Sequence, residues 1–181
     1  MLPRMLEVIP LFKEDYQFII GGAPAQELSF YQTILAQYET QHEVQIVFNR
    51  TYDLMQAAEA ALVTSGTATL ETALFNTPEV VCYTGNPISY QIAKRLIKVK
   101  YISLVNLILD RSLVKELIQK ELSGDNLIKE LGEITKAGDG RERILNGYQE
   151  LRQKLGNVGA SERTASHMYE FLQTKEARTA S

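Results

Sequence analysis

The residues best suited to chemistry lie in a short turn between an apolar run and a helical segment. Leu62 and Val63 belong to the run, and Ser65-Gly66-Thr67 follows almost directly. Gly66 lets the backbone approach a ligand, while the hydroxyls of Ser65 and Thr67 can cap the helix or donate to an oxyanion. The first amides of a helix lack partners and lie at the positive end of its dipole, an arrangement that suits a diphosphate.

Glu71 lies four residues after Thr67, one turn into the same helical segment. A carboxylate there could reach the two hydroxyls of a ribose beside a diphosphate. The alternative is that Ser65 is a plain N-cap and Glu71 a surface residue of an amphipathic helix. The turn is neither a P-loop nor a dinucleotide fingerprint, because Gly-Lys-Ser/Thr does not follow it and G-x-G-x-x-G is absent.

The segments around this turn alternate between strand and helix periodicity. Short apolar runs predict strands at 17–20, 44–48, 60–63 and 79–83, with a fifth near 101–103. Helical spacing predicts helices at 2–13, 26–39, 52–58, 67–75, 87–98, 112–121, 124–136, 139–155 and 160–174. This alternation is typical of an α/β fold with a Rossmann-like parallel sheet and flanking helices. Ligands of such sheets bind beyond the carboxyl ends of the strands, where the turn would lie.

Composition excludes several functions. The net charge of −3 gives no global basic field for nucleic acid. The single cysteine, Cys82, sits in an apolar run and reads as a buried structural thiol, which fits a reducing cytosol and leaves no disulfide framework. No apolar stretch approaches the roughly 18–20 residues of a membrane-spanning helix, so any contact with a membrane would be from its surface.

Several linked motifs resemble the lipid-A-disaccharide synthase family. The resemblance covers about residues 1–172 and rests on segments that keep the family's order and spacing. These segments are 18–24 (FIIGGAP), 65–74 (SGTATLETAL), 78–83 (PEVVCY), 93–96 (AKRL), 101–108 (YISLVNLI) and 116–119 (ELIQ).

The resemblance implies the C-terminal, nucleotide-sugar-binding half of a GT-B glycosyltransferase. Such enzymes transfer 2,3-diacylglucosamine from its UDP conjugate to 2,3-diacylglucosamine 1-phosphate (lipid X) in lipid A biosynthesis, without a metal or other cofactor. The implied organisation is a nucleotide-sugar-binding domain over 1–138, helices over 139–174 that pack across the domains or onto a partner, and a disordered tail over 175–181. The family's acceptor-binding domain would precede this region, so the chain alone is expected to have negligible transferase activity.

The resemblance also assigns site residues. It implies that Ser65, Gly66 and Thr67 hold the UDP diphosphate and that Glu71 holds the ribose. Asn106 falls at a functionally important asparagine of the family and is the catalytic candidate, although Val105 replaces the usual proline before it. Two further positions, Glu116 and Gln119, would line the nucleotide side of the cleft. A plain helix face is the alternative for both.

Contacts with other molecules follow from two further patterns. A small basic cluster could face an anionic lipid headgroup or the membrane surface, which would make the protein cytoplasmic and peripheral to the inner membrane; a solvated helix face is the alternative. The cluster consists of Lys94, Arg95, Lys98 and Lys100. An apolar stripe within 139–155 needs a surface to bury against, which predicts packing on a partner, homodimerisation or fraying. The stripe consists of Ile144, Leu145, Tyr148, Leu151 and Leu155.

Two other functions compete with this one. The first is another GT-B UDP-sugar enzyme, such as the peptidoglycan N-acetylglucosaminyltransferase or a UDP-sugar 2-epimerase, which shares a Ser-Gly turn followed by a helical glutamate. The segment from Tyr101 to Asn106 argues against it. The second is a non-catalytic UDP-binding module, which would bind UDP without turnover.

Overall fold

The computed structural model describes residues 1–64, 66–85, 100–135, 138–156 and 159–179 of the 181-residue chain. The described residues form five parallel strands in two sheets, one with the order β1-β2 and the other with the order β3-β4-β5. The strands are β1 (Phe18–Gly22), β2 (Val44–Phe48), β3 (Ala61–Thr64), β4 (Glu79–Tyr83) and β5 (Lys115–Ile118). The predicted α/β fold with parallel strands is confirmed.

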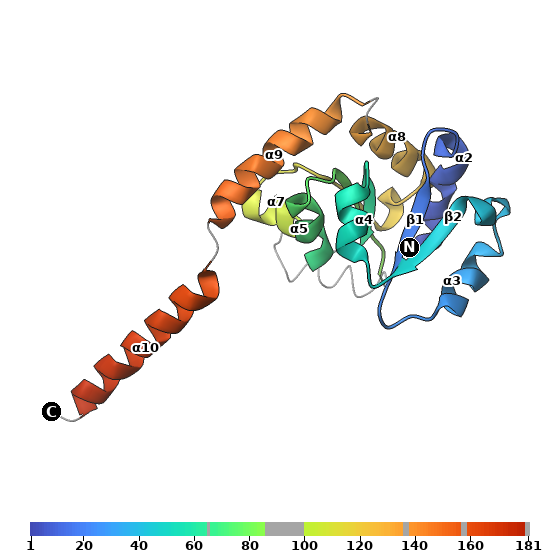
Figure 1. The fold of residues 1–181 in the computed structure, drawn as a ribbon. Helices are drawn as coiled ribbons and strands as arrows, with labels where there is room; N and C mark the ends of the chain where they lie inside the picture. Colours follow the sequence, from blue (N-terminus) through green and yellow to red (C-terminus); the bar gives the residue numbers. More distant parts are fainter. Residues whose placement is uncertain (65, 86–99, 136–137, 157–158, 180–181) are drawn as a thin grey trace.

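Helices connect and flank these strands (Figure 1). The described helices are α1 (Leu2–Met5), α2 (Ile9–Phe12), α3 (Leu28–Leu35), α4 (Thr51–Ala57), α5 (Thr67–Leu74), α7 (Leu104–Leu109), α8 (Gly124–Ile134), α9 (Gly140–Leu155) and α10 (Ala160–Thr179), with 3₁₀ turns η1 (Leu6–Val8), η2 (Glu39–Glu43) and η3 (Gln119–Glu121). The helix expected at 87–98 lies outside the described residues.

Strand β4 is the centre of the three-stranded sheet. Its residues Val80, Val81 and Cys82 are fully buried, as expected for a continuous apolar run covered on both faces. Burial raises the pKa of the Cys82 thiol to about 12. Cys82 is therefore the inert structural thiol that the sequence predicts.

Two predicted elements between residues 100 and 121 are wrong. The segment predicted as a helix at 112–121 contains strand β5, which pairs in parallel with β4, and then turns into η3. The segment at 101–103 is not a strand, because the amides of Ile102 and Ser103 donate to the carboxylate of Glu116 instead of to a neighbouring strand. Lysine and glutamate favour helices locally, but the vacant edge of β4 decides the outcome.

Helix α9 packs on the same domain as the three-stranded sheet. Ile144, Tyr148 and Leu151 are buried in the core that contains β4 and β5, so most of the apolar stripe is covered within this chain. Three arginines of α9 also donate to main-chain carbonyls of distant segments. The pairs are Arg141 with Glu59, Arg143 with Leu113, and Arg152 with Leu74.

Helix α10 projects away from the rest of the molecule (Figure 1). It follows Gly156 and Gly159, both of which have positive φ, and it continues to Thr179, beyond the predicted end at residue 174. Its large apolar side chains are more than half exposed, at 58–69%. They are Met168, Tyr169, Phe171 and Leu172.

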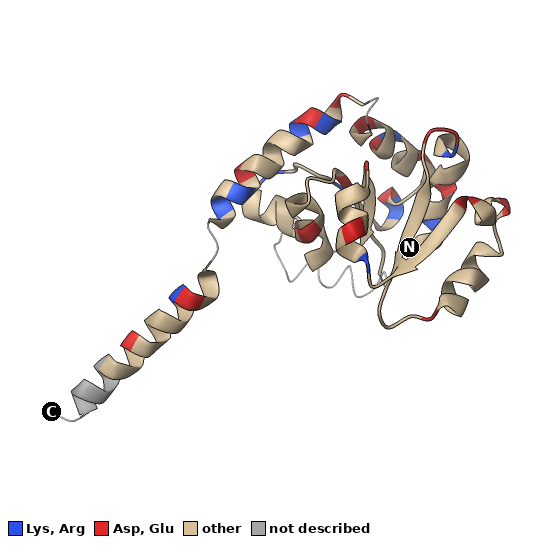
Figure 2. Ribbon diagram, in the orientation of Figure 1, with Lys and Arg blue, Asp and Glu red and all other residues tan. Residues whose placement is uncertain are grey.

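The described surface mixes both signs of charge. Figure 2 shows acidic and basic residues interleaved along α9, which agrees with the small net charge of −3. Within the described ranges, none of the helices combines the length and the apolar character needed to cross a bilayer.

Candidate functional site

The turn after β3 begins the candidate site. Ser65 lies outside the described residues. Gly66 is the N-cap of α5 and has φ 140 and ψ −162, a conformation that a residue with a side chain rarely adopts. Gly66 and Thr67 are exposed, and a Cβ placed on Gly66 would meet no atom within 4 Å. The start of α5 therefore opens to its surroundings at the carboxyl end of β3.

Thr69 holds this turn by a hydrogen bond to Gly66. Its role was not predicted from the sequence. Its side chain is fully buried, and its Oγ1 donates to the carbonyl of Gly66 at 2.8 Å. The same oxygen accepts from the amide of Leu104 at 3.3 Å. One hydroxyl thus joins the first turn of α5 to the first turn of α7. This role depends on Leu104, which is 35 residues away, so no local signal in the sequence distinguished Thr69.

Asn106 lies on α7 and is completely buried. Its Oδ1 accepts from the amides of Leu113 and Val114 at 2.8 and 3.0 Å. Its Nδ2 donates to the carbonyl of Val114 and to Oε1 of Glu116, both at 2.9 Å. Asn106 therefore holds the backbone that leads into β5, and its amide is fully used within the chain.

Glu116 completes this network from β5. Its Oε2 accepts from the amide of Ile102 at 3.0 Å, and its Oε1 accepts from the amide of Ser103 at 2.9 Å. The hydroxyl of Ser103 in turn accepts from the amide of Asn106 at 3.2 Å and caps α7. Glu116 and Asn106 together fix the start of α7, which Thr69 links to Gly66.

Gln119 joins the ends of two neighbouring strands. It follows β5 directly and has a positive φ of 55. Its Oε1 accepts from Thr84 Oγ1 at 3.3 Å, and its Nε2 donates to the carbonyl of Gly85 at 3.2 Å. Since Thr84 and Gly85 follow β4, this contact lies at the carboxyl edge of the sheet, the same edge as the turn after β3.

Glu71, on the same helix as Thr69, contacts a different part of the chain, helix α4. The hydroxyl of Tyr52 donates to Glu71 Oε1 at 3.2 Å, and the ring of Tyr52 stacks on Phe75 with centroids 5.3 Å apart. Tyr52 lies on α4, just after the carboxyl end of β2, and is 57% exposed. Tyr52 is a second residue that the sequence analysis missed, because its link to Glu71 is tertiary.

Apart from Gln119, which contacts Thr84 and Gly85, the predicted residues with described contacts form two groups around α5. Gly66, Asn106 and Glu116 belong to one hydrogen-bonded network through Thr69, Leu104 and Ser103. Glu71 lies with Tyr52 on another side of α5. The arrangement offers helix amides, a carboxylate and an aromatic ring near the carboxyl ends of parallel strands, where ligands of open α/β sheets bind.

The parallel strands with their flanking helices define a Rossmann-like α/β domain, consistent with one half of a GT-B protein. A family model described as Lipid-A-disaccharide synthetase matches residues 3–170. The chain belongs to this family.

Curated relatives agree with this assignment. Lipid-A-disaccharide synthase of Geobacter metallireducens is 34% identical over 178 residues, which are 97% of this chain and 46% of the relative. The protein of the same name from Syntrophus aciditrophicus is 36% identical over 168 residues, or 91% of this chain and 44% of the relative. The chain thus spans a little less than half the length of these relatives.

Proposed function

We propose that the chain is the donor-binding half of a glycosyltransferase that moves 2,3-diacylglucosamine from its UDP conjugate to lipid X. The observation that carries this proposal is the exposed Gly66–Thr67 turn at the start of α5, in a chain of this family. The acceptor and the group that deprotonates it would then be bound by the remaining half of the enzyme. On its own, the chain is expected to have negligible transferase activity with donor and lipid X.

The diphosphate of UDP is assigned to Ser65, Gly66 and Thr67. The first amides of α5 would donate to its oxygens, and the open space around Gly66 supports close approach of the ligand to the backbone. When the bond to the sugar breaks, negative charge grows on this diphosphate. Amides and a helix dipole that are already in place stabilise that charge without reorganising.

The ribose is assigned to Glu71, with Tyr52 as its neighbour. The hydrogen bond from Tyr52 orients the Glu71 carboxylate and leaves its other oxygen to accept from ribose hydroxyls. The exposed ring of Tyr52 offers an apolar wall beside the same position.

Asn106 and Glu116 are assigned a positioning role. Their side chains are engaged with the backbone around α7 and β5, so they would act on substrate through the loop that they hold. Gln119, half-buried where β4 and β5 end, would shape the nucleotide side of the cleft.

Isothermal titration of the chain with UDP tests the donor site. We expect binding in the micromolar to low-millimolar range, weakened about tenfold by Glu71→Ala, because a charge-assisted hydrogen bond contributes about 1.5 kcal/mol or more. Glu133→Ala on α8 is the matched control and should bind as the parent chain does. If the folded chain does not bind UDP, or if both variants bind equally well, the proposal is wrong.

Thr69→Val should weaken UDP binding although Thr69 would not touch the ligand. Valine has the shape of threonine but lacks the hydroxyl that joins Gly66 to Leu104. We expect a loss of about three- to tenfold in affinity, and Thr69→Ser should restore most of it by returning the hydroxyl. Equal affinities of the parent, valine and serine variants in the same titration would exclude this positioning role.

The remaining assignments concern organisation and partners. We propose that residues 1–138 with α9 form the donor domain and that the exposed apolar face of α10 packs on the other half of the enzyme or on a second subunit. We also propose that the basic cluster of Lys94, Arg95, Lys98 and Lys100 makes peripheral contact with the cytoplasmic face of the inner membrane. Lys94, Arg95 and Lys98 of that cluster lie outside the described residues, and Lys100 pairs with Asp110 at 3.0 Å.

A further inference from the structure

The carboxyl end of helix α5 is held by helix α9, which packs against it (Figure 1). The first turn of α5 carries the proposed diphosphate site, so contacts at the other end of this helix bear on that site. The contacts come from Tyr148 and Arg152, one turn apart on α9. The Tyr148 hydroxyl donates to the carbonyl of Thr77 at 3.3 Å, and the Arg152 guanidinium donates to Leu74 and Asn76.

Helix α5 ends in a Schellman motif that is closed by an asparagine. The amide of Asn76 donates to the carbonyl of Ala73 at 3.0 Å. The amide of Thr77 donates to the carbonyl of Thr72 at 3.2 Å. Asn76 has a φ of 59, the left-handed conformation that this motif needs and that asparagine adopts more readily than most residues. The carbonyl of Leu74, the last of the helix, receives its donor from α9.

Arg152 binds this motif with both arms of its guanidinium. Its Nη1 donates to Oδ1 of Asn76 at 2.8 Å, and its Nη2 donates to the carbonyl of Leu74. Helix α5 has no lysine or arginine of its own, so Arg152 supplies the positive charge that stabilises the negative end of a helix dipole. A planar guanidinium makes two such bonds in a fixed geometry, which the ammonium of a lysine does not.

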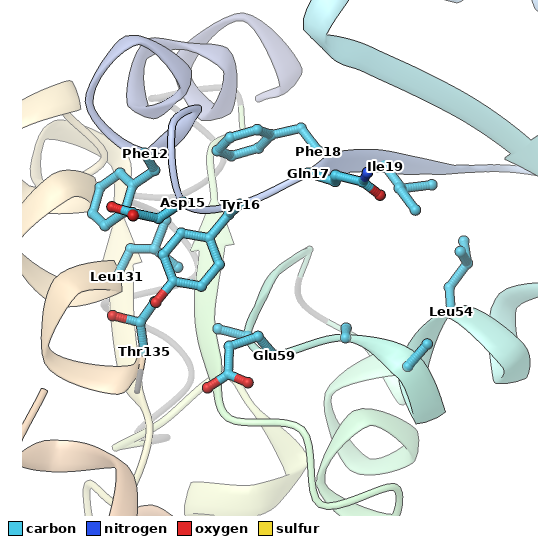
Figure 3. A pocket seen from close by; sticks show the side chains of 13 residues that line it. Phe12, Asp15, Tyr16, Gln17, Phe18, Ile19, Leu54, Glu59, Leu131 and Thr135 are labelled. Carbon is cyan, nitrogen blue, oxygen red and sulfur yellow. The ribbon is translucent and has the colours of Figure 1, made fainter. Parts of the chain in front are cut away.

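Arg141, near the start of the same helix, acts at a different place in the fold. It donates to the carbonyl of Glu59 at 2.6 Å and forms an ion pair with the Glu59 carboxylate at 2.9 Å. Glu59 precedes β3 and lies on the wall of a cavity of about 440 Å³ (Figure 3). The turn at Gly66 follows the other end of β3. Arg141 thus makes a comparable long-range contact away from the proposed donor turn.

Helix α5 is short, so the anchors at its two ends decide how well it is ordered. Its eight residues extend about 12 Å, and a helix of this length is marginal without tertiary contacts. At the amino end, the N-cap Gly66 has no side chain, and Thr69 joins this end to Leu104. At the carboxyl end, Arg152 is the anchor. Loss of this anchor would let the last turn fray and would let the first amides move out of alignment.

We propose that Arg152 is a positioning residue of the donor site and that it acts through α5. This inference rests on the proposed function, because it concerns the diphosphate that the first amides of α5 would bind. The guanidinium keeps the helix formed to its last residue and holds it on α9, so that these amides keep one geometry. Arg152 does not touch the ligand, since it lies at the opposite end of a helix about 12 Å long.

Hydrogen exchange without nucleotide tests the anchor by itself. The full chain is compared with its Arg152→Met variant, which keeps an apolar stem but loses the charge and both donor arms. We expect amides over residues 70–74 of α5 to exchange about fivefold or more faster in the variant, because the end of the helix opens more often. Amides of β5, in another part of the sheet, are the internal reference and should exchange as in the parent.

Isothermal titration of the same chains with UDP tests the effect on the site. Arg152→Met should bind UDP about three- to tenfold more weakly, and Arg152→Lys should recover part of the loss by returning the charge and one donor. Lys154→Met removes a charge from a more exposed position on α9, and Arg141→Met removes the comparable contact beside Glu59. Both controls should bind UDP as the parent does, even where overall stability is lower.

The two measurements together decide the role of Arg152. Faster exchange in α5 with weaker UDP binding, partly restored by lysine, supports the inference. Parent-like exchange in α5, equally faster exchange in β5, parent-like affinity of Arg152→Met, or an equal loss of affinity in Arg141→Met would overturn it. The proposed function fails differently, by absence of UDP binding to the parent chain, and the inference then fails with it.

Discussion

The substitution Asn106→Ala is expected to lower the free energy of unfolding of the chain by about 3 to 5 kcal/mol. The side chain of Asn106 is fully buried and satisfies the amides of Leu113 and Val114 and the carbonyl of Val114. Alanine leaves these main-chain groups without partners inside the core, and each such group costs about 1–3 kcal/mol. Glu116 also loses a donor. Urea denaturation followed by circular dichroism measures the change.

Asn126→Ala is the matched control for this prediction. Asn126 donates to a single carbonyl, that of Glu121, from an exposed position on α8. Water replaces a contact of this kind, so the control should lose no more than about 1 kcal/mol. If the two variants unfold at the same urea concentration, Asn106 is not the structural centre of this loop, and direct contact with substrate becomes the better explanation of its position.

The substitution Glu79→Gln is expected to stabilise the folded chain at neutral pH and to leave its stability in acid almost unchanged. Glu79 is fully buried at the start of β4, and within the described residues neither carboxylate oxygen has a hydrogen-bond partner. Burial raises the pKa of the Glu79 carboxyl well above its ordinary value of 4.5. The folded chain therefore keeps a proton that the unfolded chain releases.

The sign of the pH dependence follows from this difference. As the pH rises above about 4.5, the unfolded chain binds fewer protons than the folded chain, so the parent loses up to about 1.4 kcal/mol of stability per pH unit until the folded carboxyl ionises. Glu79→Gln removes this loss. Urea denaturation of both chains at pH 5, 6, 7 and 8 should give a gap that widens with pH.

Glu14→Gln removes an exposed carboxyl and serves as the control for charge alone. It should follow the parent over the whole pH series. Parallel stability curves for the parent and Glu79→Gln would mean that the Glu79 carboxylate is solvated or paired when ionised, contrary to its burial.

The local sequence pattern was sufficient to predict much of the fold and the position of the turn at Gly66. The runs around Ile19, Ile46, Leu62 and Val80 predicted four of the strands, because inner parallel strands are recognisable as continuous apolar segments. The turn at Gly66 was predicted for a similar reason, since a strand, a glycine and a helix follow one another directly. The ligand assignments of Thr67 and Glu71 remain predictions.

Tertiary contacts decided what the sequence could not. Residues around Glu116 favour a helix locally but form β5, because β4 offers an unpaired edge there. The role of Thr69 depends on Leu104, which is 35 residues away, and that of Tyr52 on Glu71, which is 19 residues away. No periodicity within one element carries such information, so the links that hold the site together appear only in the folded chain.

The arginines of α9 have a consequence for how this domain is completed. Arg141 and Arg152 bind carbonyls 82 and 78 residues earlier in the chain, and Arg143 binds one 30 residues earlier. Contacts of such long sequence separation must close large loops before they are formed, which slows folding. During synthesis, β1 to β4 leave the ribosome well before α9 does, and their core stays uncovered until that helix arrives. Helix α9 is thus the last element to cover the core that contains β4 and β5. Nascent chains that stop before α9 would leave apolar side chains of this core exposed.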